Sequence, residues 1–209
     1  MNYRVLLGLV LCLPTWAVAA QCSLLIVGDS LSSGYGLAAG ESWVNKLAAR
    51  LEKSAPDWRV VNASVSGDTL QNGLQRLSPA LWRHKPSGVL IELGGNDALR
   101  GTPPATIRLN LGNLVKQARA SGAWVALLEP PILPNYGKAY GTAIKQVYVD
   151  VAREQKVTRV PCFICGVATD PALMQKDGIH PNARAQTKMM EAVWPSIQPK
   201  LHCMNSKRS

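Results

Sequence analysis

Two segments at opposite ends of the chain carry residue types that cooperate in acyl transfer. Near the N-terminus, Ser30 follows a short apolar run that ends in Gly28-Asp29. Near the C-terminus, Asp177 and His180 stand three residues apart in a turn-rich segment. A serine hydroxyl becomes a useful nucleophile when a histidine takes its proton, and a carboxylate must hold that imidazole in the correct tautomer. One local turn can hold Asp177 and His180, so the fold has to bring Ser30 beside them.

Two further segments supply donors for the oxyanion that forms when an ester is attacked. Gly67 and Asn96 each lie in a polar segment that follows an apolar strand candidate. Gly67 offers a backbone N–H with no side chain in the way, and Asn96 offers a side-chain amide. Ser30 can add its own backbone N–H. The sequence therefore predicts an oxyanion hole made by Ser30, Gly67 and Asn96.

Each of these residues also has a common structural use. Ser30 can cap a helix, and Gly67 and Asn96 can be ordinary turn residues. His180 can be a plain surface histidine. The presence of all the segments, in this order, favours the catalytic interpretation. Asp29 adjoins Ser30, but adjacent side chains point in different directions, so we interpret Asp29 as a turn-former.

Taken together, the segments resemble the SGNH, or GDSL, hydrolase family. The resemblance covers about residues 24–201. The family segments are 28–31, 62–69, 94–97 and 177–181, and the segments 60–64, 92–97, 133–137 and 177–181 carry a likeness to one branch of the family. Within the family the chain is similar to a bacterial branch of multifunctional thioesterases, lysophospholipases and arylesterases. The resemblance implies a triad of Ser30, Asp177 and His180, and a reaction that needs no cofactor.

A parallel α/β sheet would bring these segments together. Strand-like runs alternate with helix-like stretches, which favours a parallel sheet with right-handed crossovers and helices on both faces. The predicted strands are 24–27, 59–61, 89–93, 124–128 and 158–160, and the predicted helices are 43–53, 70–84, 105–120, 139–155 and 183–197. The family resemblance implies a three-layer α/β/α sandwich whose five-stranded parallel sheet has flavodoxin-like order.

Apolar residues near the predicted site loops are candidates for contact with an acyl chain. We expect such contact from Ile179 and from the loop that consists of Ile132, Leu133, Pro134, Asn135 and Tyr136. Three further apolar residues either line the same channel or belong to the core; they are Trp43, Leu99 and Ile107.

The N-terminus has the features of a cleavable signal peptide. Arg4 provides the positive charge, residues 5–13 are an apolar run, and Ala17-Val18-Ala19-Ala20 provides small residues for cleavage after Ala19 or Ala20. The run is far shorter than the ~20 residues that a membrane-spanning helix needs. Gln21 before Cys22 fits a lipoprotein site poorly. We therefore expect residues 1–20 to be a cleaved leader and residues 21–209 to be a single hydrolase domain, periplasmic or secreted.

Composition restricts the class of partner. The chain of 209 residues is 47% hydrophobic and 17% charged, which excludes a disordered protein. Its net charge of +10 either attracts anionic head groups and CoA phosphates or belongs to a solvated face without a role. The basic residues are scattered and lack interleaved aromatics, so no nucleic-acid partner is expected. We expect a monomer without a stable membrane anchor.

The cysteines indicate disulfides. Removal of the leader leaves four of the five: Cys22, Cys162, Cys165 and Cys203. An even number in an exported protein predicts at least one bridge, and we favour one that involves Cys162 or Cys165, with the connectivity open. The Cys162–Cys165 spacing also occurs in redox motifs, but the bulky middle residues Phe163 and Ile164 favour a structural bridge. With three histidines and His180 assigned to catalysis, no metal site is expected.

The sequence thus predicts a serine hydrolase that cleaves acyl esters and thioesters through an acyl-serine intermediate. Its substrate would be a small acyl ester, a lysophospholipid or a thioester. One alternative is a carbohydrate O-deacetylase with the same residues, which an open groove lined with exposed tryptophans would favour. The other is a non-catalytic binding protein of the same fold, which would be expected to lack a catalytic residue, and none is missing.

Overall fold

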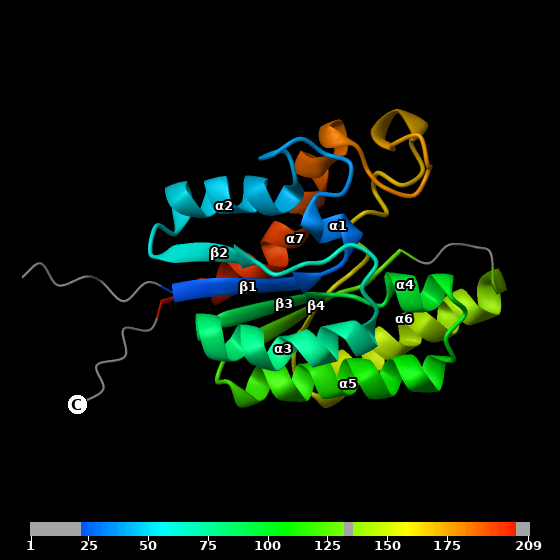
Figure 1. Cartoon of the computed structure of the whole chain (residues 1–209), viewed down its shortest axis with the longest axis horizontal. Helices are drawn as coiled ribbons and strands as arrows, with labels where there is room; N and C mark the ends of the chain where they lie inside the picture. The colour runs from blue at the N-terminus through cyan, green and yellow to red at the C-terminus, as the bar shows by residue number, and fades with distance from the viewer. Residues whose placement is uncertain (1–21, 132–135, 204–209) are drawn as a thin grey trace, which may run out of the picture.

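The computed structural model describes residues 22–131 and 136–203, which form a parallel sheet between two layers of helices (Figure 1). The sheet has five strands in the order β2-β1-β3-β4-β5, and all neighbouring strands are parallel. The strands are β1 (Cys22–Gly28), β2 (Trp58–Asn62), β3 (Gly88–Glu92), β4 (Trp124–Leu128) and β5 (Thr158–Val160). This is the flavodoxin-like order, so the predicted fold class is confirmed.

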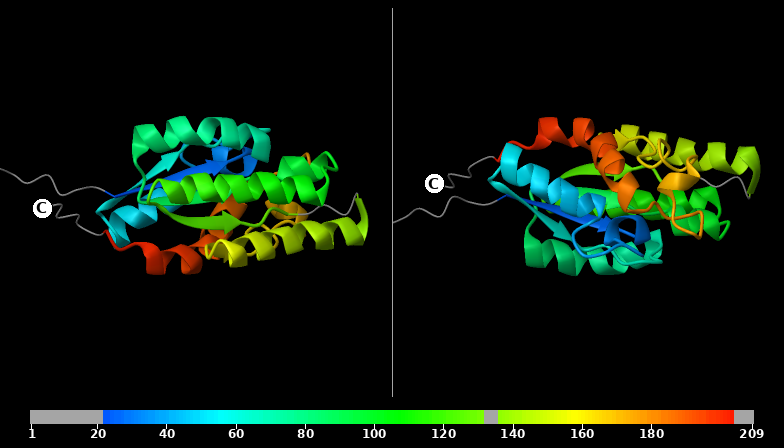
Figure 2. Two further views of the ribbon diagram at one scale, coloured as in Figure 1. Left: turned by 90° about the horizontal axis from the view of Figure 1, so that it is seen from below. Right: turned by 90° about the horizontal axis from the view of Figure 1, so that it is seen from above.

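Two helices cover one face of the sheet, and three cover the other (Figures 1 and 2). The first layer consists of α2 (Trp43–Ser54) and α7 (Gln186–Ile197). The second layer consists of α3 (Leu70–His84), α5 (Pro104–Ala120) and α6 (Gly137–Glu154). With both faces covered, every residue of β1 and β3 is buried, as is usual for a parallel sheet.

The core is divided by the sheet into two clusters. Successive side chains of a strand point to opposite faces, so Leu24 and Ile26 pack with α2 and α7, whereas Leu25 and Val27 pack with the opposite layer. The two clusters together hold the strands rigidly. Loops at the carboxyl ends of the strands are therefore presented by a fixed frame.

Local capping residues set where several helices begin. The Ser42 hydroxyl accepts a hydrogen bond from Asn45 N–H before α2. Thr69 and Asn72 form a capping box that starts α3. Pro104 opens α5, where its missing N–H is not needed. These signals are local in the sequence, and the predicted boundaries of these three helices lie within one residue of the observed ones.

Short elements account for the differences from the predicted structure. The helices α1 (Ser30–Ser33) and α4 (Gly95–Leu99) are not among the predicted helices. Helices of four and five residues are too short to show a hydrophobic period. The predicted helix 183–197 begins with a 3₁₀ turn, Ala183–Ala185, before α7. Two further 3₁₀ turns are Pro171–Leu173 and Gln198–Lys200.

Two disulfides pair all four of the expected cysteines. One joins Cys22 to Cys203, and the other joins Cys162 to Cys165. The expectation of a bridge that involves Cys162 or Cys165 is confirmed. The predicted leader, residues 1–20, lies outside the described residues. Within the part that the structure describes, no helix is long and apolar enough to cross a membrane.

Candidate active site

The structure brings Ser30, His180 and Asp177 into one hydrogen-bonded row. Nε2 of His180 lies 2.8 Å from Oγ of Ser30. Nδ1 of the same ring lies 2.7 Å from Oδ2 of Asp177. The sequence separation of 150 between Ser30 and His180 is therefore bridged by the fold, since β1 and the segment before α7 end at the same edge of the sheet. The row has the geometry of a nucleophile, a base and an orienting carboxylate.

The turn that carries Asp177 and His180 is held by Asp177 itself. Its Oδ1 accepts hydrogen bonds from the backbone N–H of Ile179 at 2.9 Å and of His180 at 3.0 Å. The hydrogen bond from the His180 backbone, followed by the one from its imidazole, lowers the pKa of Asp177 from 3.8 to about 2. Asp177 is therefore ionised at neutral pH and fixes His180 with its Nδ1 protonated.

Gln175 ties this turn to the loop after α1. Its backbone N–H donates to the His180 carbonyl at 2.7 Å, and its side-chain amide donates to the Tyr35 carbonyl at 2.9 Å. The Tyr35 ring then packs against the imidazole of His180, with 4.7 Å between ring centroids. The imidazole of His180 is thus positioned by one backbone hydrogen bond and by the Tyr35 ring, contacts that the sequence did not indicate.

Ser30 stands immediately beyond β1, where the chain turns into α1. Asp29 caps this helix, since its Oδ1 accepts from Leu31 N–H at 3.0 Å. The preceding Gly28 allows a close approach, because a Cβ atom there would lie 2.7 Å from Oε2 of Glu92 and 2.8 Å from Ser32. Asp29, interpreted from the sequence as a turn-former, is the N-cap of α1, and Ser30 follows it as the first residue of that helix with its hydroxyl toward His180.

The three predicted oxyanion donors line the same pocket as the Ser30 hydroxyl. Gly67 has φ +83°, a conformation that favours glycine, so its N–H has a fixed direction. Among the described residues, no acceptor takes the backbone N–H of Ser30 or Gly67. Nδ2 of Asn96 differs, since it donates to Oδ2 of Asp29 and to the Asp68 carbonyl, both at 3.0 Å. To donate to an oxyanion as well, the Asn96 amide must therefore form a bifurcated hydrogen bond.

A pair of buried carboxyl groups lies directly behind Asn96. Asp29 is 3% exposed and Glu92 is fully buried. Oε2 of Glu92 accepts from the Ser32 hydroxyl at 2.7 Å and from Asp29 N–H at 3.4 Å. Burial raises the pKa of Asp29 from 3.8 to about 6. Burial, followed by the charge of Asp29, raises the pKa of Glu92 well above its ordinary value, which favours a protonated Glu92 beside an ionised Asp29.

An apolar pocket of about 260 Å³ opens beside Ser30. The polar residues that line it are Asp29, Ser30, Tyr35, Ser66, Asn96 and His180. The apolar side chains that line it come from the four segments that follow β1, β3, β4 and β5, and they are Leu31, Leu99, Pro131, Ile164, Ala168, Met174 and Ile179. The volume is slightly below the usual range for pockets that take drug-sized ligands, which suits a single acyl chain.

The residues expected to contact the acyl chain have different positions. Ile179 lines the pocket, and so does Leu99. Trp43 and Ile107 belong to the core, because neither is exposed to solvent. The predicted contacts Ile132, Leu133, Pro134 and Asn135 lie outside the described residues.

Tyr136 stands behind the pocket wall and is not among its lining residues. Its hydroxyl donates to the Leu99 carbonyl at 3.1 Å. Its ring lies 5.4 Å from that of Tyr140, centroid to centroid. Tyr136 therefore supports the Leu99 part of the pocket wall from outside.

The sequence missed the segment after β5 as a source of pocket residues. Ile164, Ala168 and Met174 all come from it. It contains no long helix or strand, so no period marks its buried positions. The one available signal was the pair of bulky apolar residues between Cys162 and Cys165, which would be unusual on a solvent-exposed loop.

Comparison with known proteins places this geometry in a family. Residues 26–188 match the model of the GDSL-like Lipase/Acylhydrolase family. The chain is 48% identical over 193 residues to the esterase TesA of Pseudomonas aeruginosa, covering 92% of this chain and 96% of that one. It is 40% identical over 191 residues to the thioesterase 1/protease 1/lysophospholipase L1 of Escherichia coli K12, covering 91% and 90%.

A solved structure gives the same result for the fold. The psychrotrophic esterase EstA from Pseudoalteromonas, in a structure inhibited by monoethylphosphonate, is 37% identical and superposes with a TM-score of 0.82. The match covers 86% of this chain and 98% of that one. The overall fold is therefore shared with an esterase of known structure.

Proposed function

The chain belongs to the GDSL-like Lipase/Acylhydrolase family and hydrolyses esters, and we propose that it does so with Ser30 as nucleophile, His180 as general base and Asp177 as orienting carboxylate. The observation that carries this assignment is the unbroken row of hydrogen bonds from Ser30 to His180 to Asp177. Ser30 and His180 both line the apolar pocket. An acyl carbonyl in that pocket would therefore meet the nucleophile directly.

In the first step, Oγ of Ser30 attacks the acyl carbonyl while Nε2 of His180 takes its proton. The imidazolium is stabilised by Asp177, whose low pKa keeps it ionised. His180 then returns the proton to the leaving alcohol or thiol, and the acyl group remains on Ser30. Water, activated by the same base, releases the acid and restores the hydroxyl.

The oxyanion of each tetrahedral intermediate would be stabilised by the backbone N–H groups of Ser30 and Gly67 and by the Asn96 amide. The two backbone donors are free to act without rearrangement. The Asn96 amide already interacts with ionised Asp29, so its hydrogen atom would be shared when negative charge develops on the substrate. Donors fixed in advance are the main source of oxyanion stabilisation in acyl transfer.

Acyl esters and thioesters are the substrate class that suits the pocket, because its walls are apolar. Thioesters, lysophospholipids and aryl esters share an acyl group and differ in the leaving group, which would point to the open side. The structure offers little to the alternative of a carbohydrate deacetylase. The most exposed tryptophan among the described residues, Trp82, lies on α3 and does not line the pocket.

We propose that the enzyme is exported and that residues 1–20 are its cleaved leader. Two disulfides suit an oxidising compartment, which the periplasm and the extracellular space provide. The mature domain would then be residues 21–209. N-terminal sequencing of the protein recovered from the periplasmic fraction tests the boundary, and a mature chain that still began at Met1 would contradict it.

Covalent labelling tests the nucleophile. A fluorophosphonate reagent should modify Ser30, and mass spectrometry of the digested protein locates the adduct. The Ser30→Ala variant is the matched control and should remain unlabelled with an unchanged far-UV spectrum. Labelling of a different residue, or unchanged labelling of the variant, would contradict the assignment.

A further inference from the structure

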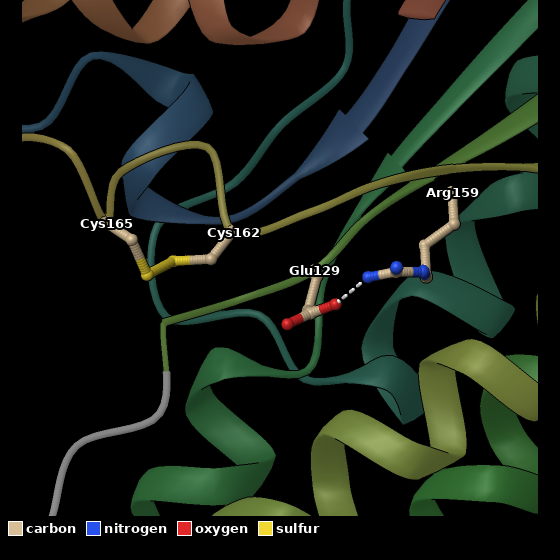
Figure 3. Close-up of a disulfide and its surroundings, with 4 residues drawn as sticks. All are labelled: Glu129, Arg159, Cys162 and Cys165. Atoms are coloured by element: carbon tan, nitrogen blue, oxygen red, sulfur yellow. Dashed lines mark hydrogen bonds and ion pairs between the residues drawn. A yellow bond between two sulfur atoms is a disulfide. The ribbon is translucent and has the colours of Figure 1, made fainter.

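The Cys162–Cys165 disulfide closes a four-residue ring beside the acyl pocket. Figure 3 shows the bridge on the loop that leaves β5. The two residues inside the ring, Phe163 and Ile164, are 2% and 1% exposed. Phe163 packs edge-on against Trp43 in the core, with 5.6 Å between ring centroids. Ile164 lines the pocket. The ring therefore anchors one side chain in the core and presents the other to the substrate.

The ring starts from a fixed base. Glu129, directly after β4, donates its N–H to the Val160 carbonyl at 3.0 Å. The buried Glu129 carboxylate also forms an ion pair with Arg159 on β5 (Figure 3). Together these contacts join the ends of β4 and β5, two residues before the first cysteine. The beginning of the ring is therefore held in place independently of the disulfide.

The position of Ile164 in turn sets the position of the next pocket residue. The backbone N–H groups of Val167 and Ala168 both donate to the Ile164 carbonyl at 2.9 Å. Ala168 lines the pocket beside Ile164. Within the ring, the one backbone hydrogen bond runs from Cys165 N–H to the Cys162 carbonyl at a long 3.3 Å. No helix or strand lies between residues 161 and 170, so the disulfide and the burial of Phe163 are what constrain this part of the wall.

We propose that the Cys162–Cys165 disulfide determines acyl-chain selectivity by holding Ile164 and Ala168 in the pocket wall. This inference rests on the proposed function, since it takes the pocket to be the acyl site of Ser30. An acyl chain long enough to reach the wall gains binding energy in the transition state from a wall that is already fixed. An acetyl group does not reach that far and gains nothing. Opening the ring should therefore weaken hydrolysis of long-chain esters and spare acetate esters.

The same arrangement makes selectivity sensitive to thiols. A thiolate of a dithiol reductant attacks one sulfur of the bridge, and the other sulfur leaves as a cysteine thiolate. The second thiol of the reductant then attacks the mixed disulfide. The products are two cysteine thiols and the cyclic oxidised dithiol, with two electrons and two protons transferred to the protein. Cys165 is exposed, so a reductant can approach the bridge from solvent.

The experiment compares kcat/KM for p-nitrophenyl octanoate and p-nitrophenyl acetate. In the Cys162→Ser, Cys165→Ser double variant, the octanoate-to-acetate ratio should fall roughly five- to tenfold. The matched control is the Cys22→Ser, Cys203→Ser double variant, which removes the other bridge and should keep the wild-type ratio. Dithiothreitol added to the folded control should then reproduce the lower ratio.

Two outcomes would overturn the proposal: equal ratios in both double variants, or an equal loss on both esters when the ring is opened. If the ring variant fails to fold, Ile164→Ala keeps the bridge and should still lower the ratio roughly tenfold. An unchanged ratio in Ile164→Ala would overturn the proposal as well. Fluorophosphonate titration of each preparation distinguishes failure of this inference from failure of the proposed function. A protein that reacts at Ser30 but shows an unchanged ratio refutes the inference and leaves the assignment of the nucleophile standing.

Discussion

The two ends of the sheet each carry a disulfide, and the two disulfides stand in different surroundings. At the amino end, Cys22 is the first residue of β1 and is joined to Cys203, where the chain returns after α7 (Figure 1). At the carboxyl end, Cys162 and Cys165 form a small ring beside the pocket. The first bridge encloses nearly the whole domain, with a sequence separation of 181, whereas the second has a separation of 3.

The two bridges have different roles: one concerns the stability of the fold and the other the specificity of the pocket. A bridge restricts the unfolded chain more when it closes a longer loop, so most of the stabilisation should come from Cys22–Cys203. The small ring can restrict the unfolded chain only slightly. Its role in our proposal is instead to fix two side chains of a pocket wall in the folded protein. One kind of covalent bond therefore serves two purposes, depending on which end of the sheet it joins.

Buried charge shows the same contrast between the ends. At the amino end, Trp58 and Trp124 pack against each other, with 6.1 Å between ring centroids. At the carboxyl end, Asp29 and Glu92 are buried together behind Asn96. Burying a carboxylate costs stability, and such costs concentrate at sites that need a particular charge or geometry. The carboxyl end thus gives up some stability to position the groups of the active site.

The largest expected effect is at the carboxyl end. Ser30→Ala should lower kcat on a p-nitrophenyl ester by about 10⁴-fold or more, because the nucleophile is lost. The free energy of unfolding should change little, because the hydrogen bond between the Ser30 hydroxyl and His180 is only partly buried. Steady-state kinetics and urea unfolding of the same preparation check both parts. A kcat close to wild type would refute the assignment of the nucleophile.

At the amino end, the largest effect should be on stability alone. The Cys22→Ser, Cys203→Ser double variant should lose about 3–5 kcal/mol of unfolding free energy, because the unfolded chain regains the freedom of a very long loop. Its kcat on p-nitrophenyl acetate at a temperature where it is folded should match wild type. A clear loss of kcat in the folded variant would show that the two ends are coupled.

The contrast between the ends was only partly predictable from the sequence. The strands β4 and β5 and the helix α3 have the predicted bounds, because apolar periodicity and capping residues are local signals. The row of Ser30, His180 and Asp177 was also predictable, since each residue lies in a recognisable segment. Such signals specify which residues come to the carboxyl edge of a parallel sheet.

Contacts that depend on tertiary packing were not predictable. The pairing of Asp29 with Asn96 and Glu92 requires the register of β1 against β3, in which Gly28 pairs with Glu92. The contribution of Ile164 to the pocket depends on how an irregular segment folds back over the sheet. The connectivity of the cysteines had three possible solutions, and local sequence does not distinguish them. In each case the missing information was the relative placement of distant segments.

Removal of an oxyanion donor should have an intermediate effect. Asn96→Ala should lower kcat by about 10²–10³-fold with little change in KM, because the lost interaction forms mainly in the transition state. The structure adds a second consequence, since Asp29 would lose the amide that donates to its Oδ2. Stopped-flow kinetics with p-nitrophenyl acetate would separate acylation from deacylation. A raised KM with unchanged kcat would mean that Asn96 binds only the ground state.

The smallest expected effect is the loss of folding stability that results from burying the Asp29 carboxylate. Its folded pKa of about 6 lies above the ordinary value of 3.8, so between those pH values the folded protein holds a proton that the unfolded chain has lost. This group therefore makes the protein less stable as pH rises from about 4 to 6. By linkage, a shift of this size corresponds to about 2–3 kcal/mol of unfolding free energy. This stability is present below the window and lost above it.

Asp29→Asn removes this titration while its amide oxygen can still accept from Asn96. The unfolding free energy of the wild type relative to the variant should therefore decline across the window, as measured by urea unfolding at several values between pH 4 and 7. Asp177 titrates below the window with the opposite sign and is present in both proteins, so it cancels in the difference. The Glu92→Gln variant is a second case of the same sign, because the raised pKa of Glu92 means that the unfolded chain loses this proton before the folded protein does. A difference between wild type and Asp29→Asn that did not change with pH would mean that the buried carboxyl costs nothing. The active-site end of the sheet would then be no less stable than the end that the long disulfide closes.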